Sequence, residues 1–130
     1  QALKQAGLSP DDIQYINAHA TSTPIGDLCE ITAIKSLFGV SNPVSVSSTK
    51  SATGHMLGAA GGVEAIFTVL SLLNQIAPPT LNLFDPDPDA EGIDFIRHTA
   101  RHIKIDNAMS NGFGFGGINA TIILKRWEGI

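Results

Sequence analysis

The sequence is poor in charge, in cysteine and in aromatic residues. Charged residues make up 15% of its 130 positions, against about a quarter in an average soluble domain. We therefore expect more than one face of the fold to be covered, by other elements or by a partner. The net charge is −4 and no run of basic residues is present. This balance argues against nucleic acid and an anionic membrane surface as direct partners.

Cys29 is the only cysteine, so an internal disulfide is excluded and a reducing compartment is favoured. The longest apolar run is interrupted by Glu64 and by glycines, which argues against a membrane span. The chain begins at Gln1 inside a helical pattern, with neither an initiator Met nor a signal peptide. We expect one domain over residues 1–130 that is a piece of a longer polypeptide.

Strand and helix patterns alternate through the first two-thirds of the chain. A helix with one apolar stripe should begin with Asp27 as its cap and end at Gly39. In the last third of the chain two strands follow in succession, so the last strand should pair antiparallel to its neighbour. The pattern predicts an α/β fold with a mixed sheet. The expected strands are 13–18, 44–47, 95–96, 108–111 and 120–125.

The stretch from Ser47 to Glu64 is the centre of this pattern. It opens with hydroxyls and Lys50, presents His55, and runs into a helix that is apolar nearly all round. Such a helix is normally buried, with Lys50 and His55 beside its positive N-terminal end. Three glycines fall on one face at helical spacing, where another backbone should approach closely: Gly54, Gly58 and Gly61.

His19 and His55 are the first candidates for chemistry, because each follows a short strand or its loop in hydroxyl- and glycine-rich surroundings. Two neutral imidazoles that converge can donate hydrogen bonds to a developing oxyanion or enolate. Satisfied structural histidines are an equally weighted alternative. Zinc bound by His19, His55 and Cys29 is a weaker one, since Cys29 lacks a Cys-x-x-Cys partner and suits a small packed side chain. His98 and His102 are expected to be solvated surface residues.

Glu64 inside an apolar helix is costly unless it is paired, and Lys50 is the nearest candidate partner. Asn17, Ser110 and Asn111 end neighbouring strands at one edge of the sheet, where they could surround Glu64 with oxygens. Such a cluster suits a hard monovalent cation, sodium- or potassium-like, or a tightly held water. A plain ion pair between Lys50 and Glu64 is the alternative.

The glycine-rich segment 112–117 appears too long for a tight hairpin. It matches neither a phosphate-binding loop nor a dinucleotide fingerprint, both of which require a following helix. One interpretation is a flexible hairpin end. The other is a gate whose aromatic side chains move and whose backbone N–H groups face a substrate oxygen.

Three motifs stand out, NAHATSTPIGD at 17–27, SSTKSATGH at 47–55 and NGFGFGGIN at 111–119. In this order they resemble motifs of the β-ketoacyl-[acyl-carrier-protein] synthases, the elongating condensing enzymes of fatty-acid synthesis. The similarity runs from the first helix to the last strand and is greatest to the KAS II type. The resemblance implies the C-terminal half of a thiolase-like layered αβαβα fold with a buried central helix. The N-terminal half, which holds the nucleophile cysteine, has no match here.

The resemblance also implies roles for individual residues. His19 and His55 would stabilise the enolate formed when malonyl-carrier protein loses carbon dioxide, and Lys50 with Glu64 would organise their surroundings. Thr21 and Thr23 would bind the phosphopantetheine arm. Phe115 would be the gate and supply half of an oxyanion hole, with Phe113 and Gly114 lining the substrate path. Asp27 and Glu30 would support the loop after His19.

No cofactor is implied, because phosphopantetheine arrives on the acyl-carrier protein. The implied partners are that carrier protein, the missing N-terminal half and a second copy in a homodimer, with no nucleic acid and no membrane. The implied location is the cytoplasm of a bacterium or, less favoured, a mitochondrial or plastid matrix. Glycine at 112 and isoleucine at 118 depart from the family's commoner serine and threonine. A thiolase-like partner or chain-length subunit that has lost catalysis is the alternative function.

Overall fold

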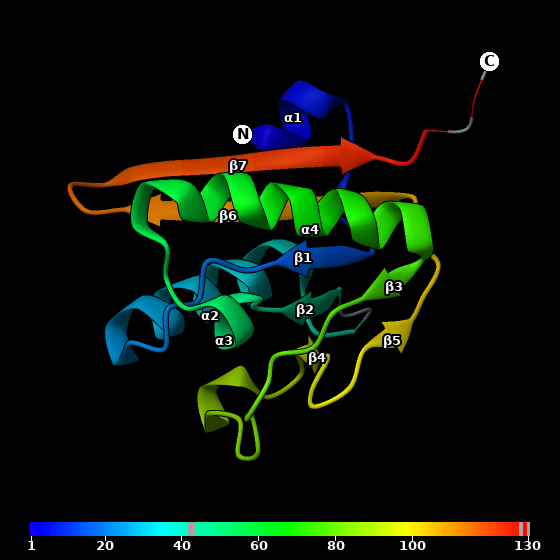
Figure 1. Ribbon diagram of the computed structural model, residues 1–130. Coiled ribbons are helices and arrows are strands. Elements are labelled where there is room, and N and C mark those ends of the chain that lie inside the picture. The colour runs from blue at the N-terminus through cyan, green and yellow to red at the C-terminus, as the bar shows by residue number, and fades with distance from the viewer. Residues whose placement is uncertain (42–43, 128, 130) are drawn as a thin grey trace.

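The computed structural model describes residues 1–41, 44–127 and 129. Its main sheet has five strands in the order β4-β2-β1-β6-β7 (Figure 1). The first four are parallel, and β7 runs antiparallel to β6. The predicted mixed sheet and antiparallel last strand are therefore confirmed. The strands are β1 (Tyr15–Asn17), β2 (Ser45–Ser47), β4 (Asp94–Phe95), β6 (Asn107–Gly114) and β7 (Ile118–Lys125). A small second sheet pairs β3 (Ile76–Ala77) with β5 (Arg101–His102).

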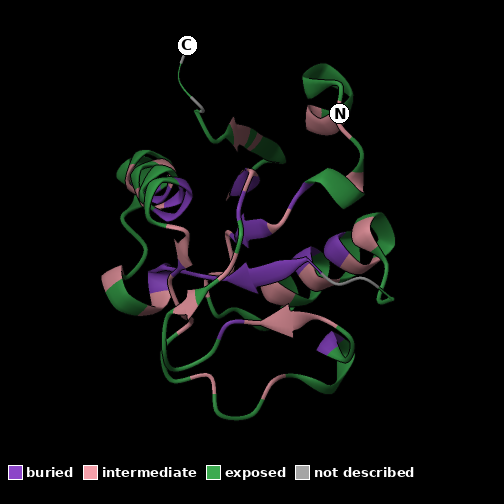
Figure 2. Cartoon of the chain, turned by 90° about the vertical axis from the view of Figure 1, so that its right-hand side faces the viewer, coloured by how far each residue is buried: buried purple, intermediate pink, exposed green. Residues whose placement is uncertain are grey.

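Two long helices lie on opposite faces of the main sheet, α2 (Pro24–Phe38) on one and α4 (Ala60–Asn74) on the other (Figure 2). The remaining helical segments are short. They are α1 (Ala2–Ala6), α3 (Lys50–Thr53) and the 3₁₀ turns η1 (Pro10–Asp12), η2 (Leu57–Ala59) and η3 (Pro88–Ala90). The turn η3 overlaps the proline-rich run 85–89.

Strand alternation divides the core in two, because successive side chains of a strand point to opposite faces. Ile16 of β1 packs on the α2 side with Ile34. Tyr15, its neighbour, packs on the α4 side with Leu72. The same alternation decides which polar residues of β1 and β6 can meet near the site.

The helix α2 begins four residues earlier than predicted, with Thr23 in place of Asp27 as its cap. Pro24 occupies its first turn and Thr23 is the residue before it, so Asp27 lies inside the first turn. Proline suits this position because the N–H that it lacks has no partner there in any case. The predicted end at Gly39 is confirmed, with a φ of 71°.

The helix α4 is buried on one side only, which corrects the prediction of a fully buried helix. Its sheet-facing side carries Glu64, Thr68 and Ser71, while Ile66 and Leu73 are 60% and 66% exposed. The helix thus turns polar residues inward and apolar residues outward, the reverse of an ordinary surface helix. This arrangement leaves a broad apolar face of the chain uncovered.

The segment Leu57–Asn74 is long and apolar enough to cross a membrane by length and composition alone, which the sequence analysis did not expect. A core helix of a folded domain passes the same test. Glu64 lies within this segment and forms a buried ion pair with Lys50, and a paired charge of this kind is typical of a helix packed in protein.

The three glycines expected on one helix face lie in three different elements. Gly54 ends α3 with a φ of 72°, Gly58 belongs to η2 and Gly61 to the first turn of α4. A Cβ built at any of them meets nothing within 4 Å. Among the residues that the structure describes, then, no backbone packs closely on them. Only Gly54 has a visible conformational reason, the positive φ that stops α3.

The exposed face of α4 should make the isolated chain self-associate. Leu73→Glu should suppress that association without changing the far-ultraviolet circular dichroism, because Leu73 is 66% exposed. Leu72→Glu is the matched control. Leu72 is 4% exposed and packs beside Tyr15, so a charge there should unfold the chain. Sedimentation velocity and circular dichroism test both variants, and equal behaviour of the two would contradict the orientation of α4.

Candidate functional site

His19 and His55 converge as predicted. His19 follows the end of β1, and His55 follows α3. Their ring centroids lie 5.4 Å apart with the rings nearly perpendicular, at 87°. The ring of Phe113 lies 5.5 Å from that of His19. His19 therefore stands between a second imidazole and an aromatic ring of β6.

The backbone after β1 is held by the carboxylate of Glu30, a residue only 4% exposed. The N–H groups of His19 and Ala20 donate to Glu30 Oε1 and Oε2, at 3.0 and 2.7 Å. One turn earlier on α2, Asp27 Oδ1 accepts from the N–H of Ser22 at 3.1 Å. Ser22 has a φ of 65°, which a non-glycine residue holds only when its surroundings fix it. These contacts agree with the supporting positions expected for Asp27 and Glu30.

Burial raises the pKa of Glu30, the largest of several opposing effects. The N–H of Ala20, the side-chain amide of Asn111 and the N–H of His19 act in the other direction, because each donates to the charged form. The carboxylate thus depends on its donors. Removing one of these donors would favour protonation of the Glu30 carboxylate and weaken its hydrogen bonds to the loop after His19.

The pKa of His19 is lowered, first by burial and then by the positive charge of Lys50 and the presence of His55, while Asp27 opposes the shift. Because folding lowers this pKa, His19 stays neutral down to a lower pH in the folded chain than in the unfolded chain. Below its unfolded value of about 6.5 the unfolded chain binds more protons, so this residue makes stability fall as pH falls through that window. At neutral pH His19 is a neutral imidazole that can donate one N–H.

Lys50 and Glu64 form the predicted ion pair, between Lys50 Nζ and Glu64 Oε1, with both side chains buried. The pair joins α3, which carries the chain to His55, to the inner side of α4. Among the described residues, Glu64 Oε2 has no hydrogen-bond partner.

The four-residue oxygen cluster predicted around Glu64 does not form as expected. Asn17 Nδ2 donates to Thr49 Oγ1 at 3.1 Å and, more weakly, to the backbone oxygen of Glu64 at 3.4 Å. Ser110 is the register partner of Asn17 on β6. Asn111 is the next residue, so its side chain lies on the other face of the sheet, where Nδ2 donates to Glu30. Strand alternation separates Asn111 from the other three.

Thr21 and Thr23 lie at the entrance of the same loop, with their hydroxyls 3.2 Å apart. A Cβ at Gly26 would lie 2.5 Å from Thr23 Oγ1, so a larger residue there would force the Thr23 side chain to move. Two hydroxyls so placed offer both donors and acceptors to a polar chain such as an amide-containing arm.

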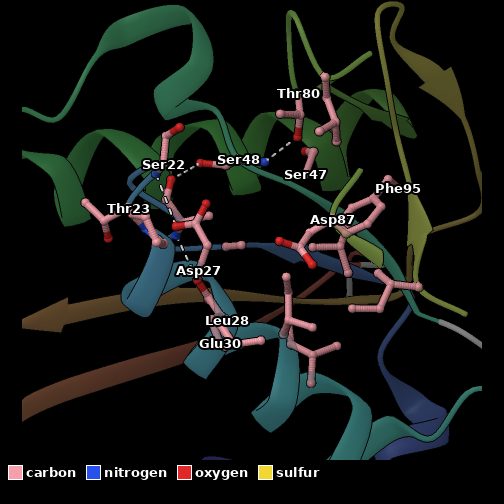
Figure 3. Close-up of a pocket in the computed structure, with 18 residues that line it drawn as sticks. Ser22, Thr23, Asp27, Leu28, Glu30, Ser47, Ser48, Thr80, Asp87 and Phe95 are labelled. Carbon is pink, nitrogen blue, oxygen red and sulfur yellow. Dashed lines mark hydrogen bonds between the residues drawn. The ribbon is translucent and has the colours of Figure 1, made fainter. Parts of the chain in front are cut away.

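Two cavities border the loop after His19. One, of about 400 Å³, is lined by Thr21, Lys50 and His55 among other residues. The other, of about 350 Å³, lies between α2 and the sheet, with Ile34 and Phe95 in its apolar lining. Ser22 and Asp27 border both, and their hydrogen bond is drawn in Figure 3. The first cavity is the one that His55 lines.

The glycine-rich segment is a tight hairpin, which corrects the sequence prediction. Pairing of β6 with β7 continues to Gly114 and Ile118, so only residues 115–117 form the turn. Gly116 and Gly117 both have a φ of 81°, a conformation that favours glycine. Phe115 stands fully exposed at the tip.

Cys29 is exposed on α2 and not packed as we expected. No group of three or more metal-binding side chains occurs in the part of the chain that the structure describes, so the zinc alternative finds no support. His98 and His102 are exposed, as predicted.

Residues 1–84 match the family model described as the beta-ketoacyl synthase, C-terminal domain. The chain belongs to this family. It is 49% identical over 128 residues to 3-oxoacyl-[acyl-carrier-protein] synthase 2 of Staphylococcus aureus strain COL, covering 98% of this chain and 31% of that protein. The chain thus spans about a third of the length of the curated relatives it matches.

Solved structures agree with the fold of this β-ketoacyl synthase domain. A beta-ketoacyl synthase from Burkholderia phymatum STM815 superposes with a TM-score of 0.93 at 43% identity, covering 98% of this chain and 31% of that one. A type II polyketide ketosynthase in complex with its acyl-carrier protein and bound to a hexaketide gives a TM-score of 0.91 at 37% identity, covering 98% and 31%. The expected thiolase-like, mixed α/β architecture is confirmed.

Sequence reasoning placed Asn111 in the wrong cluster and did not consider Thr121. Thr121 Oγ1 donates to Asn111 Oδ1 at 2.9 Å. The signal was present, because residues 107–114 and 118–125 form a hairpin in which Asn111 and Thr121 are directly opposed. It was missed because segment 112–117 was interpreted as a long loop, which left the register of the two strands undefined.

Lys50→Met should destabilise the protein by about 3–5 kcal/mol, because it leaves the carboxylate of Glu64 buried without its counter-charge. Lys104→Met is the control. Lys104 pairs with Asp106 at 3.0 Å but is 79% exposed, and such pairs contribute about 0–1 kcal/mol. Urea denaturation of the full-length protein measures both. Equal losses would show that the Lys50–Glu64 pair behaves as a solvated one.

Proposed function

We propose that this chain supplies the two-histidine part of a β-ketoacyl-[acyl-carrier-protein] synthase that elongates fatty acids by decarboxylating condensation. The observation that carries the proposal is the convergence of His19 and His55, 5.4 Å apart, above the buried Lys50–Glu64 pair. Names of relatives at about 50% identity support it. The rest of the polypeptide, including the nucleophile cysteine and the cover for α4, completes the enzyme.

In the proposed reaction, an acyl chain is carried as a thioester on that cysteine, and malonyl-acyl-carrier protein enters. The carbon–carbon bond to the malonyl carboxylate breaks and carbon dioxide leaves. The electron pair of the broken bond stays on the thioester fragment and forms an enolate. N–H groups of His19 and His55 donate to the enolate oxygen, as preorganised donors do in an oxyanion hole. The enolate carbon attacks the acyl carbonyl, and the cysteine leaves as a thiolate. The product is a 3-ketoacyl thioester on the carrier protein.

The state of His19 suits this role. Its pKa is lowered by burial and by Lys50, so it holds a neutral ring whose N–H can be donated without a prior proton transfer. Thr21, which lines the cavity of Lys50 and His55, and Thr23, whose hydroxyl lies 3.2 Å from that of Thr21, would bind the phosphopantetheine arm. No cofactor beyond that arm is needed for the steps above, which exchange no electrons with an outside acceptor.

The proposal includes acyl-carrier protein as the partner, a homodimer as the assembly and the cytoplasm as the compartment. A polyketide ketosynthase in complex with its acyl-carrier protein is among the structural neighbours at 37% identity, which supports the first. The single cysteine of the chain suits the last. A non-catalytic partner subunit is the competing function, and it differs in one respect that can be measured: it would form no acyl-cysteine.

His19→Ala and His55→Ala in the full-length protein should each slow malonyl decarboxylation by about 10²–10³, because each removes one donor to the enolate oxygen. Transfer of the acyl chain to the cysteine should continue. Carbon dioxide release and mass spectrometry of the acyl-enzyme report the two steps. The control is Cys29→Ser, on the exposed surface of α2, which should change neither. Decarboxylation at the parent rate in either histidine variant would contradict the enolate role, and stable acylation of Cys29 would contradict the assignment.

Phe115→Ala should slow formation of the acyl-cysteine several-fold while leaving the unfolding midpoint unchanged. The reason is that Phe115 is fully exposed at the hairpin tip, so in the proposed gate its ring would contact the substrate and contribute little to the core. Stopped-flow acylation and thermal unfolding measure the two effects. Trp127→Ala, which changes another exposed aromatic residue, is the control. Identical acylation by the parent and Phe115→Ala would show that the hairpin tip is only a turn and has no gating role.

A further inference from the structure

Asn111 lies on β6 two residues before Phe113, so both side chains lie on the α2 side of the sheet, the side of Glu30. Phe113 contacts the ring of His19 directly. Asn111 reaches the same residue through Glu30, since its Nδ2 donates to Glu30 Oε1 at 3.0 Å. The N–H of His19 donates to that same oxygen at 3.0 Å. One face of β6 therefore contacts the ring of His19 directly through Phe113, and its backbone indirectly through Asn111 and Glu30.

The orientation of the Asn111 amide decides whether this link exists. A carboxylate can only accept hydrogen bonds, so Nδ2 must face Glu30, and the reversed amide would set two oxygens against each other. Thr121 Oγ1 donates to Asn111 Oδ1 at 2.9 Å from the opposite strand. That bond satisfies the oxygen of an amide whose residue is 6% exposed, and it holds the amide in the orientation that Glu30 requires.

A continuous hydrogen-bonded path thus runs from β7 to the histidine loop. It passes from the hydroxyl of Thr121 through the Asn111 amide to Glu30 Oε1, and from there to the N–H of His19. Asn111 and Thr121 are directly opposed in the hairpin that ends at Phe115. We infer that Thr121 and Asn111 are positioning residues that align His19 for the decarboxylation step from the base of this hairpin.

The expected change in decarboxylation rate rests on the proposed function, whereas the expected loosening of the backbone at His19 and Ala20 does not. Thr121→Val keeps the shape of the side chain and removes the hydroxyl, so the Asn111 amide loses the bond that orients it. Asn111→Leu removes the amide itself. Both should loosen the backbone at His19 and Ala20, and neither changes a group that touches the substrate.

The test uses the full-length protein with the variants Thr121→Val, Thr121→Ser and Asn111→Leu. Thr121→Val should slow malonyl decarboxylation about tenfold, the effect of losing one hydrogen bond in the path. Acylation of the cysteine should be unaffected, and Thr121→Ser should restore the parent rate. Amide hydrogen exchange of the segment that contains His19 and Ala20 should quicken in Thr121→Val and not in Thr121→Ser. Thr32→Val, which removes a hydroxyl bonded to the backbone oxygen of Leu28 on exposed α2, should change nothing.

A double-variant cycle separates a shared path from two unrelated effects. Because Thr121 acts through Asn111, Thr121→Val should cause no further loss in the Asn111→Leu background. Additive losses would overturn the inference, as would equal slowing of both catalytic steps, which indicates general destabilisation. A protein that lacks decarboxylation altogether would remove the proposed function, and the exchange measurement would still decide the path: unchanged exchange at His19 in Thr121→Val overturns it.

Discussion

The buried ion pair between Lys50 and Glu64 fixes how the rest of this domain is arranged. Taking two charges out of water costs several kcal/mol each, so Glu64 has to face Lys50 and the sheet. Thr68 and Ser71 follow it at helical spacing and lie on the same inner side of α4. The apolar residues of α4 are then left on the outer side, where Ile66 and Leu73 stand exposed. One electrostatic constraint therefore places α3 and His55 beside His19 and also leaves an apolar face uncovered.

The exposed apolar side of α4 and the low content of charged residues have the same explanation. A domain with 15% charged residues cannot cover its surface as an ordinary soluble domain does, and α4 shows where the deficit lies. The curated relatives are about three times as long as this chain, which covers 31% of the first of them. In the proposed enzyme the remaining polypeptide packs on the outer side of α4, which would make it the buried helix that its sequence indicates.

The sequence predicted those features that depend on short-range patterns. The alternation of β1, the glycine that ends α2 and the pairing of Lys50 with Glu64 each follow from a few neighbouring residues. Two of the failures involve information that no local pattern holds. Cys29 and the outer side of α4 have the composition of packed residues, but the surfaces that would pack on them lie outside this chain. Asn111 was assigned to Glu64 because both lie near one sheet edge, and only the alternation of β6 shows that it faces Glu30.

The tight hairpin changes what a gate at this position can be. Since β6 and β7 stay paired as far as Gly114 and Ile118, motion that keeps this pairing is confined to residues 115–117. Phe113 lies inside the paired region and holds its place against the ring of His19, whereas Phe115 projects from the turn. A movement of the tip can therefore admit or exclude a substrate while the strand below it keeps the histidine aligned. In the proposed gate, the two glycines with positive φ would serve the moving part, and the Thr121–Asn111–Glu30 path would serve the fixed part. Access and alignment would then be controlled by neighbouring but separate portions of one hairpin.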